Sequence, residues 1–262
     1  MVVMTFEGVS FAKRIESELE KRVLEMGRKP RLVIFWVGDN QSSEKYVAKK
    51  KELGERIGIE VVVERVEVAK LESGIRKVVS EADGVMVQLP IPGMSRDEAQ
   101  KVIDLIPIEK DVDGLTGENL KLIATGEQEH LPATVKAVGK IMDEAIRETE
   151  LDIEKMKVAV VGSRGVVGQP LVSQLKRFGF EIGEFDEGDE LKLSDFDVVI
   201  SATGREGLIK PEMVKDGVVG IDVGFPKGDF DPAVEKKAGF FTPVPGGVGP
   251  VTVVCLFENL LQ

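Results

Sequence analysis

Tyr46 and Lys50 stand four positions apart and could act together in proton-transfer chemistry. They follow the apolar run 32–37 and the turn 38–40, in a stretch that predicts a helix ending near residue 57. Residues four apart lie on one face of a helix. A lysine can serve as a base when burial or neighbouring groups lower its pKa towards neutrality. The simpler alternative is a surface lysine that lies along an aromatic ring.

Three other segments place polar groups or rigid backbone at turns. An apolar strand predicted at 84–88 ends in Gln88 and is followed by Leu89-Pro90-Ile91-Pro92. The motif Lys110-Asp111-Val112-Asp113-Gly114 sets two carboxylates beside a turn, although a plain Asp-Gly turn would also explain it. The segment 242–252 is rich in Pro and Gly. A loop this rigid is typical of a segment that packs against a planar ligand, or of a hinge between domains.

A glycine-rich loop lies between a predicted strand at 157–161 and a predicted helix at 167–178. It reads Gly162-Ser163-Arg164-Gly165-Val166-Val167-Gly168. In dinucleotide-binding folds the first glycine permits the tight turn, the last lets helix and strand approach, and the helix N-terminus offers N–H groups to the pyrophosphate. The spacing is Gly-x-x-Gly-x-x-Gly, so a βα turn without a ligand remains possible on this motif alone.

Asp186 supports a dinucleotide site, because it ends the next predicted strand about 20 residues further on, where an acidic residue binds a ribose 2′-hydroxyl. Such a carboxylate favours NAD and repels the 2′-phosphate of NADP, whereas Arg164 could pair with a phosphate. Asp186 could also belong to a solvated acidic loop, 186–190. Thr203 follows a further strand at a point where backbone can approach a cofactor.

The predicted elements are those of an α/β protein. Helices alternate with strands at 32–37, 59–66 and 84–88, and this order predicts parallel strands with right-handed crossovers. A helix is predicted at 134–147, and the charged stretch 147–157 is the natural linker. Beyond the linker, strands are predicted at 157–161, 181–185, 197–202 and 218–223. We therefore predict two α/β domains, the second a Rossmann-like dinucleotide-binding domain.

Composition excludes several kinds of chemistry. The 262 residues carry 35 basic and 46 acidic side chains, a formal net charge of −11, which disfavours nucleic acid as a partner. The single cysteine, Cys255, excludes an internal disulfide and a multi-thiolate metal site, and the single histidine, His130, excludes a two-histidine metal centre. No metal site, targeting segment or membrane span is predicted. We expect a cytoplasmic protein in which His130 faces solvent from a loop and Cys255 is packed.

Four motifs in the same order resemble the methylenetetrahydrofolate dehydrogenase/cyclohydrolase (FolD-type) family almost end to end. They are Tyr46-Val47-x-x-Lys50, Val87-Gln88-Leu89-Pro90-x-Pro92, 110–114 and Pro243-Val244-Pro245-Gly246-Gly247-Val248-Gly249-Pro250. The resemblance implies that the last helix returns to the first domain. The folate-binding catalytic domain would then be 1–148 with 243–262, and the NAD(P)-binding domain 149–242, with the active-site cleft between them.

The resemblance implies two reactions of one-carbon metabolism. 5,10-Methylenetetrahydrofolate would give a hydride to NAD(P)+, and the resulting 5,10-methenyl cation would be hydrolysed to 10-formyltetrahydrofolate. Lys50 would handle protons in the hydrolysis, Gln88 would hold its amine and Asp113 would grip the pterin. Substrate contacts are implied at Tyr46, Gly247, Val248, Gly249 and Pro250, and cofactor contacts at Gly162, Ser163, Arg164, Gly168, Asp186, Thr203 and Phe225. A homodimer is also implied.

The chain departs from the family pattern around the cofactor. The family loop usually reads Gly-Arg-Ser where this chain has Gly162-Ser163-Arg164, and NADP-using members often carry His-Ser where it has Asp186-Glu187. Both NADP and NAD therefore stay open, and Asp186 favours NAD. Two alternatives for the whole protein are a dehydrogenase of another small substrate and a dinucleotide-binding sensor without turnover. The intact Tyr46, Lys50, Gln88 and Asp113 argue against both.

Overall fold

A computed structural model describes residues 3–127 and 130–262 and divides into two compact units. The large-sheet unit comprises the described residues of Met1–Ala12 and Thr134–Thr252. The small-sheet unit comprises the described residues of Lys13–Ala133 together with Val253–Gln262. The predicted α/β class with parallel sheets is confirmed, because every strand pair in both sheets is parallel.

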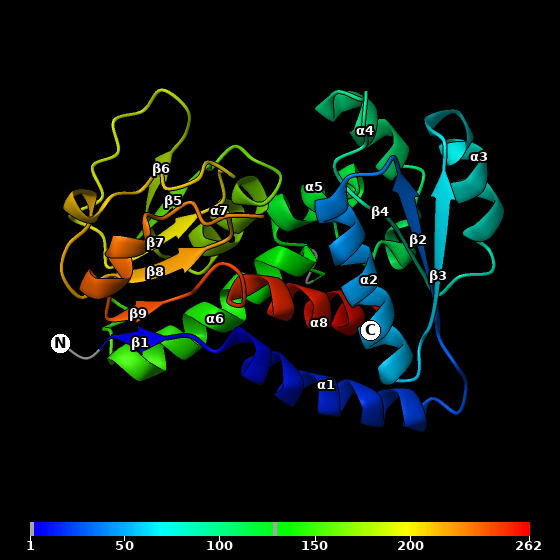
Figure 1. Cartoon of the computed structure of the whole chain (residues 1–262), viewed down its shortest axis with the longest axis horizontal. Helices are drawn as coiled ribbons and strands as arrows, with labels where there is room; N and C mark the ends of the chain where they lie inside the picture. The colour runs from blue at the N-terminus through cyan, green and yellow to red at the C-terminus, as the bar shows by residue number, and fades with distance from the viewer. Residues whose placement is uncertain (1–2, 128–129) are drawn as a thin grey trace. The chain divides into compact units, whose positions relative to one another are not determined.

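The small-sheet unit has three strands in the order β3-β2-β4 (Figure 1). The central strand β2 is buried from its second residue onward, as its unbroken apolar sequence predicts. On one face, Phe35 and Val85 pack against Leu71 and Ile75 of α3. The elements are β2 (Arg31–Val37), β3 (Glu60–Val66), β4 (Gly84–Val87), α2 (Gln41–Arg56), α3 (Val68–Val78), α4 (Arg96–Ile103), η1 (Ile108–Lys110) and α5 (Gly117–Thr125), together with the parts of α1 (Gly8–Glu25) and α8 (Val248–Leu260) that begin at residues 13 and 253.

The opposite face of the small sheet is covered by α2 and the end of α8. A Cβ on Gly54 of α2 would lie 2.3 Å from Val61 Cγ2 and 2.9 Å from a ring carbon of Phe257, so glycine is required for this close packing. Lys50 lies on the same helix one turn earlier, and its amine approaches Met86 of β4. The packing of α2 on the sheet therefore brings Lys50 to the end of β4.

The large-sheet unit has six strands in the order β1-β9-β8-β7-β5-β6. The chain runs from β5 outward to β6 and then returns to β7 on the other side of β5, so the strand order reverses between β5 and β7. In open parallel sheets ligands bind at such a reversal, outside the carboxyl ends of the strands. The elements are β1 (Met4–Thr5), β5 (Lys157–Val161), β6 (Glu181–Phe185), β7 (Val198–Ser201), β8 (Val219–Asp222), β9 (Phe240–Phe241), α6 (Ala133–Thr149), α7 (Gly168–Arg177), η2 (Pro211–Met213) and η3 (Pro232–Lys237).

The compact units differ from the predicted domains at residues 3–12, 134–148 and 243–252. Residues 3–12 group with the large sheet because β1 pairs with β9, with Met4 opposite Phe240. Thr134–Thr252 also belongs to that unit, so the predicted helix near 134–147 and the loop from residue 243 lie with the large sheet rather than with Lys50. Only Val253–Gln262 of the C-terminal segment groups with the small sheet.

Candidate active site

Lys50 is a buried amine with a fixed hydrogen-bond partner. Its side chain is 6% exposed, and Nζ donates to Gln88 Oε1 at 3.0 Å and lies 3.5 Å from Met86 Sδ. Burial lowers the pKa of Lys50 from its ordinary value of 10.5, and the charge of Asp113 opposes that shift only in part. A buried lysine with a lowered pKa can hold and release a proton nearer to neutral pH.

Gln88 follows the last residue of β4, and its backbone N–H still donates to Phe35 O of β2 at 2.8 Å. The side-chain Nε2 donates to Leu89 O at 2.8 Å. Because the amide nitrogen is committed to that carbonyl, Oε1 points to the lysine amine. The strand end thus fixes the partner of Lys50.

Asp113 and Asp111 have different surroundings. Both oxygens of the Asp111 carboxylate accept backbone N–H groups, from Gly114 at 2.9 Å and Thr116 at 2.7 Å, so Asp111 holds the turn. Burial raises the pKa of Asp113; the charge of Lys50 opposes this shift, and that of Asp111 adds to it. Asp113 is therefore the carboxyl group of the pair that is coupled electrostatically to Lys50.

Tyr46 lies one turn before Lys50 on α2 and is partly buried. Burial raises the pKa of its phenol. The start of this helix is set by Asn40, whose Oδ1 accepts the backbone N–H of Ser43 at 3.1 Å in the manner of an N-cap. The structure thus brings Lys50, Gln88 and Met86 into contact and couples Asp113 to the lysine, all within the small-sheet unit.

The predicted substrate contacts at 247–250 belong to the large-sheet unit. The loop before them is tight, because the Gly247 N–H donates to Pro243 O at 2.8 Å and a Cβ there would lie 2.7 Å from the same oxygen. Val248 is buried, and Val248, Gly249 and Pro250 form the first turn of α8.

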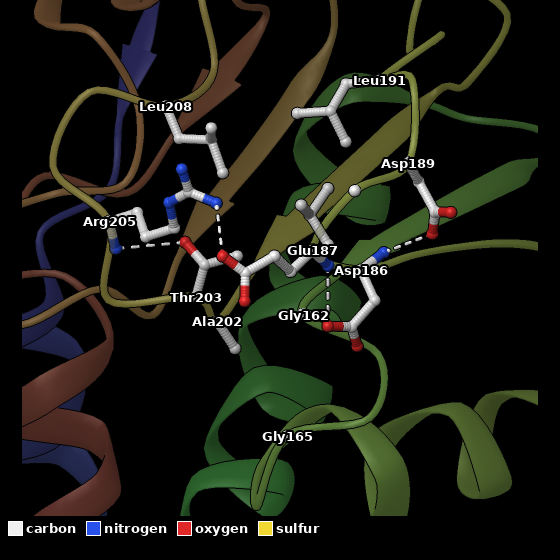
Figure 2. Close-up of a pocket in the computed structure, with 12 residues that line it drawn as sticks. Gly162, Gly165, Asp186, Glu187, Asp189, Leu191, Ala202, Thr203, Arg205 and Leu208 are labelled. Atoms are coloured by element: carbon white, nitrogen blue, oxygen red, sulfur yellow. Dashed lines mark hydrogen bonds and ion pairs between the residues drawn. The ribbon is translucent and has the colours of Figure 1, made fainter.

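The second candidate site is a cavity of about 230 Å³ at the carboxyl ends of β5, β6 and β7 (Figure 2). Gly162 adopts φ +84° at the end of β5, a conformation that favours glycine. A Cβ on Gly168 would lie 2.0 Å from the Gly162 carbonyl oxygen, so no side chain fits where α7 begins. The cavity is lined by Val161, Gly162, Gly165, Asp186, Glu187, Gly188, Asp189, Leu191, Ala202, Thr203, Arg205 and Leu208.

Three of the lining residues carry carboxylates, and Figure 2 shows the Glu187 side chain directed toward Arg205. The two Asp186 oxygens accept the backbone N–H groups of Glu187 and Arg164, each at 2.8 Å, and these bonds hold the pKa of Asp186 below its usual range. Arg205 Nη1 lies 3.7 Å from Glu187 Oε1. Each Asp186 oxygen retains a lone pair that could accept a ribose hydroxyl.

Three of the predicted cofactor residues, Gly162, Asp186 and Thr203, line the cavity. Four others, Ser163, Arg164, Gly168 and Phe225, are not among its lining residues. The sequence did not point to Arg205 or Leu208, which follow the predicted turn after β7. The only signal for Arg205 was its position two residues beyond Thr203.

Sequence models of one family match nearly the whole chain. The tetrahydrofolate dehydrogenase/cyclohydrolase catalytic domain matches residues 6–113, and the NAD(P)-binding domain of the same family matches residues 132–262. The chain belongs to the tetrahydrofolate dehydrogenase/cyclohydrolase family. The predicted family and its two activities, a methylenetetrahydrofolate dehydrogenase and a cyclohydrolase, are therefore confirmed.

Individual relatives cover almost the same length. The Bifunctional protein FolD of Mycoplasmopsis synoviae is 36% identical over 265 residues, which are 95% of this chain and 94% of the relative. A FolD crystal structure from Campylobacter jejuni has a TM-score of 0.89 at 29% identity and covers 99% of this chain and 98% of that one. A FolD from Trypanosoma brucei complexed with NADP and inhibitor has a TM-score of 0.89 at 28% identity, covering 100% of this chain and 97% of that one.

Within the described ranges 3–127 and 130–262, no helix is long and apolar enough to cross a membrane. Those residues also contain no cluster of three or more His, Cys, Asp or Glu side chains suited to a metal ion.

Proposed function

We propose that Lys50, Gln88 and Asp113 form the cyclohydrolase centre of this enzyme. The observation that carries the proposal is the buried Lys50 amine held 3.0 Å from Gln88 Oε1. Water adds to the carbon of the 5,10-methenyl cation, and the neutral amine takes a proton from the adding oxygen. The ammonium then returns that proton to the ring nitrogen as the bond from this nitrogen to the carbon breaks. The hydroxyl on the carbon releases its remaining proton to water as the C=O bond forms, leaving 10-formyltetrahydrofolate and one H+.

Asp113 and Tyr46 are proposed to hold the substrate for this step. A carboxylate can pair with two neighbouring N–H donors at the amino-pyrimidine edge of the pterin. The Tyr46 ring, one turn from Lys50, would stack on the aminobenzoyl group. The tight segment Gly247-Val248-Gly249-Pro250 is proposed as a further substrate contact, on the strength of its family motif.

The dinucleotide is proposed to bind at the large-sheet cavity. A cradle without side chains at Gly162 and Gly168 leaves room for close approach of a pyrophosphate, and the N-terminus of α7 favours an anion there. Ser163, Arg164 and Phe225 remain proposed contacts from the family resemblance. When bound, the nicotinamide accepts the hydride of methylenetetrahydrofolate; this chain's residues supply orientation.

One assay tests the whole proposal. Purified protein is given 5,10-methylenetetrahydrofolate with NAD+ or NADP+, and reduced cofactor and methenyl absorbance are followed together. We expect reduced cofactor to accumulate and methenyl absorbance to rise and then decay. Absence of reduced cofactor with both dinucleotides would exclude the proposed activity.

We propose that the enzyme prefers NAD. Three carboxylates, Asp186, Glu187 and Asp189, line the cavity and would repel a 2′-phosphate, whereas its one guanidinium, Arg205, lies beside Glu187. We expect kcat/KM for NAD to exceed that for NADP by at least about tenfold, equivalent to about 1.4 kcal/mol. Steady-state kinetics with both dinucleotides check this expectation.

Glu187→Gln should raise kcat/KM with NADP by about tenfold, or about 1.4 kcal/mol, because it removes a negative charge and releases Arg205 to pair with phosphate. Glu190→Gln is the matched control, since Glu190 lies in the same acidic loop but is not a lining residue. An equal gain in both variants would mean that overall charge, and not the Arg205–Glu187 pair, sets the preference.

The pH dependence of the cyclohydrolase should report Lys50 and Asp113. The amine acts as a base when neutral, so kcat should rise with pH as Lys50 loses its proton. This rise should be centred below pH 10.5, because the pKa of Lys50 is lowered from that ordinary value. Asp113 binds pterin when ionised, so the folate KM should rise as pH falls through a pKa above the ordinary 3.8. A pH series of kcat and KM checks both limbs. In Asp113→Asn the acid limb of KM should disappear, and its persistence would assign it to another group.

A homodimer and a cytoplasmic location are proposed on the family resemblance alone. The net charge of −11 supports the further proposal that nucleic acid is not a partner, and no membrane partner is proposed. Sedimentation velocity of the purified chain tests the dimer, and a monomer at micromolar concentration would exclude a stable one.

A further inference from the structure

The backbone carbonyl groups of the four residues 111–114 all accept hydrogen bonds. Two of the donors belong to the facing segment 130–133, and the other two are asparagine side chains that also donate to that segment. The Asp113 carbonyl accepts the Ala133 N–H at 3.2 Å. The Asp111 carbonyl lies 2.8 Å from His130 Nε2, and because a carbonyl only accepts, Nε2 donates. Asp113 therefore lies in a turn whose backbone is held by hydrogen bonds at Asp113 itself and at Asp111 before it.

Two buried asparagines make the remaining contacts. Asn259 of α8 is 5% exposed, and its Nδ2 donates to Val112 O at 3.1 Å and to Leu131 O at 2.9 Å. Asn119 of α5 is 0% exposed, and its Nδ2 donates to Gly114 O at 2.9 Å and to His130 O at 3.0 Å. Each amide thus bridges one carbonyl of the Asp113 turn to one carbonyl of the facing segment.

The burial of Asn119 is costly for stability. Among the described residues its Oδ1 has no hydrogen-bond partner although it is buried. An unsatisfied buried acceptor lowers stability, so a side chain selected only for packing would be apolar here. What the amide provides is the pair of N–H donors that join Gly114 to His130.

We propose that Asn259 and Asn119 are positioning residues that set the place of the Asp113 carboxylate for folate binding. The inference rests on the proposed role of Asp113. A binding carboxylate must be held within about 0.5 Å of its productive position, and a displacement of about 1 Å can cost 100-fold in rate. The His130 ring is a third member of the same set, and it is half-buried, whereas the sequence analysis predicted a solvent-facing loop residue.

The test compares Asn259→Ala, Asn119→Ala and Asp113→Ala in the full-length enzyme. KM is measured for methylenetetrahydrofolate, methenyltetrahydrofolate and the dinucleotide. We expect each asparagine variant to raise both folate KM values by about tenfold with an unchanged dinucleotide KM. In the Asp113→Ala background, Asn259→Ala should have little additional effect on folate KM, because the carboxylate that it positions is absent.

Arg28→Ala is the control for general destabilisation. It removes a double hydrogen bond to Asp83, which precedes β4 at the opposite end of that strand from Gln88. This variant should lower the melting temperature and leave every KM unchanged. An increase in folate KM for Arg28→Ala equal to that of Asn259→Ala would overturn the proposal.

The outcomes separate the inference from the function on which it rests. If Asp113→Ala leaves folate KM unchanged, the proposed role of Asp113 fails. If Asp113→Ala raises folate KM but neither asparagine variant does, the positioning inference fails, whatever their melting temperatures. Should the asparagine variants not fold, His130→Ala, which removes one contact from a half-buried position, carries the test. It should raise folate KM by about threefold, and an unchanged value would then overturn the inference.

Discussion

Replacing Lys50 with methionine is expected to reduce hydrolysis of 5,10-methenyltetrahydrofolate by about 10²- to 10⁴-fold, the usual contribution of a positioned general base. Methionine is unbranched and only one atom shorter than lysine, but it cannot accept a proton from water or return one to the ring nitrogen. Hydride transfer requires no proton at this position. We therefore expect the dehydrogenase rate with methylenetetrahydrofolate to fall far less than the cyclohydrolase rate.

The measurement is the decay of methenyl absorbance after methenyltetrahydrofolate is supplied directly, which makes it independent of the dinucleotide. Lys49→Met is the matched control, because Lys49 neighbours Lys50 on α2 and is exposed. Hydrolysis should be unchanged in that control. Unchanged hydrolysis in Lys50→Met would remove Lys50 from the proposed role.

The same substitution should stabilise the folded enzyme at neutral pH. Because burial lowers the pKa of Lys50 below its ordinary 10.5, the unfolded chain binds more protons than the native one between the two pKa values. The free energy of unfolding therefore rises with pH between the two pKa values. At the lower of these pH values the buried amine still destabilises the folded state, and methionine removes that destabilisation. A gain in melting temperature together with lost hydrolysis would mark Lys50 as a residue kept for function.

Much of the fold follows from local pattern. The strands β5 and β6 have the predicted limits, β2 differs from prediction by one residue at one end, and β7 and β8 differ by one residue at each end. For β2, β5, β7 and β8 the signal is strong because these are buried, mainly apolar runs. The two-residue strands β1 and β9 are too short for any periodicity and exist only through pairing with distant strands. The helix α5, nine residues long, was not among the predicted elements.

The site was predictable as far as its groups lie in local motifs. The spacing of Tyr46 and Lys50 predicted that they share a helix face, and the family resemblance implied that Gln88 holds the lysine amine, a pair that the structure joins by a hydrogen bond. The asparagine contacts could not be found in this way, because Asn259 lies 147 positions from Val112 in the chain. A side-chain amide in an apolar helix gives no signal of the carbonyl that it will meet.

Gly168→Ala should abolish measurable dehydrogenase activity while hydrolysis of supplied methenyltetrahydrofolate continues. The added Cβ would lie 2.0 Å from the Gly162 carbonyl oxygen and 2.8 Å from Ser163 Cα, both backbone atoms. Neither can move aside as a flexible side chain could, so the loop must leave the position where β5, α7 and the cavity meet. Displacement of about 1 Å at a cofactor cradle can cost 100-fold in rate, and here the required shift is larger.

The matched control is Gly139→Ala, in the middle of α6 of the same unit, where a Cβ would meet no atom within 4 Å. Alanine is favoured over glycine in a helix by about 1 kcal/mol, so this variant should keep both activities and gain slightly in melting temperature. Both reactions are measured on each variant, with the dinucleotide varied up to millimolar concentration. Loss of both reactions in Gly168→Ala would indicate unfolding of the chain, whereas loss of the dehydrogenase alone places the dinucleotide at this loop. If Gly168→Ala keeps its dehydrogenase activity with an unchanged dinucleotide KM, the cofactor binds at another site. The reason is that a binding loop formed by Gly162 and Gly168 could not accommodate the added methyl group without a shift of its backbone.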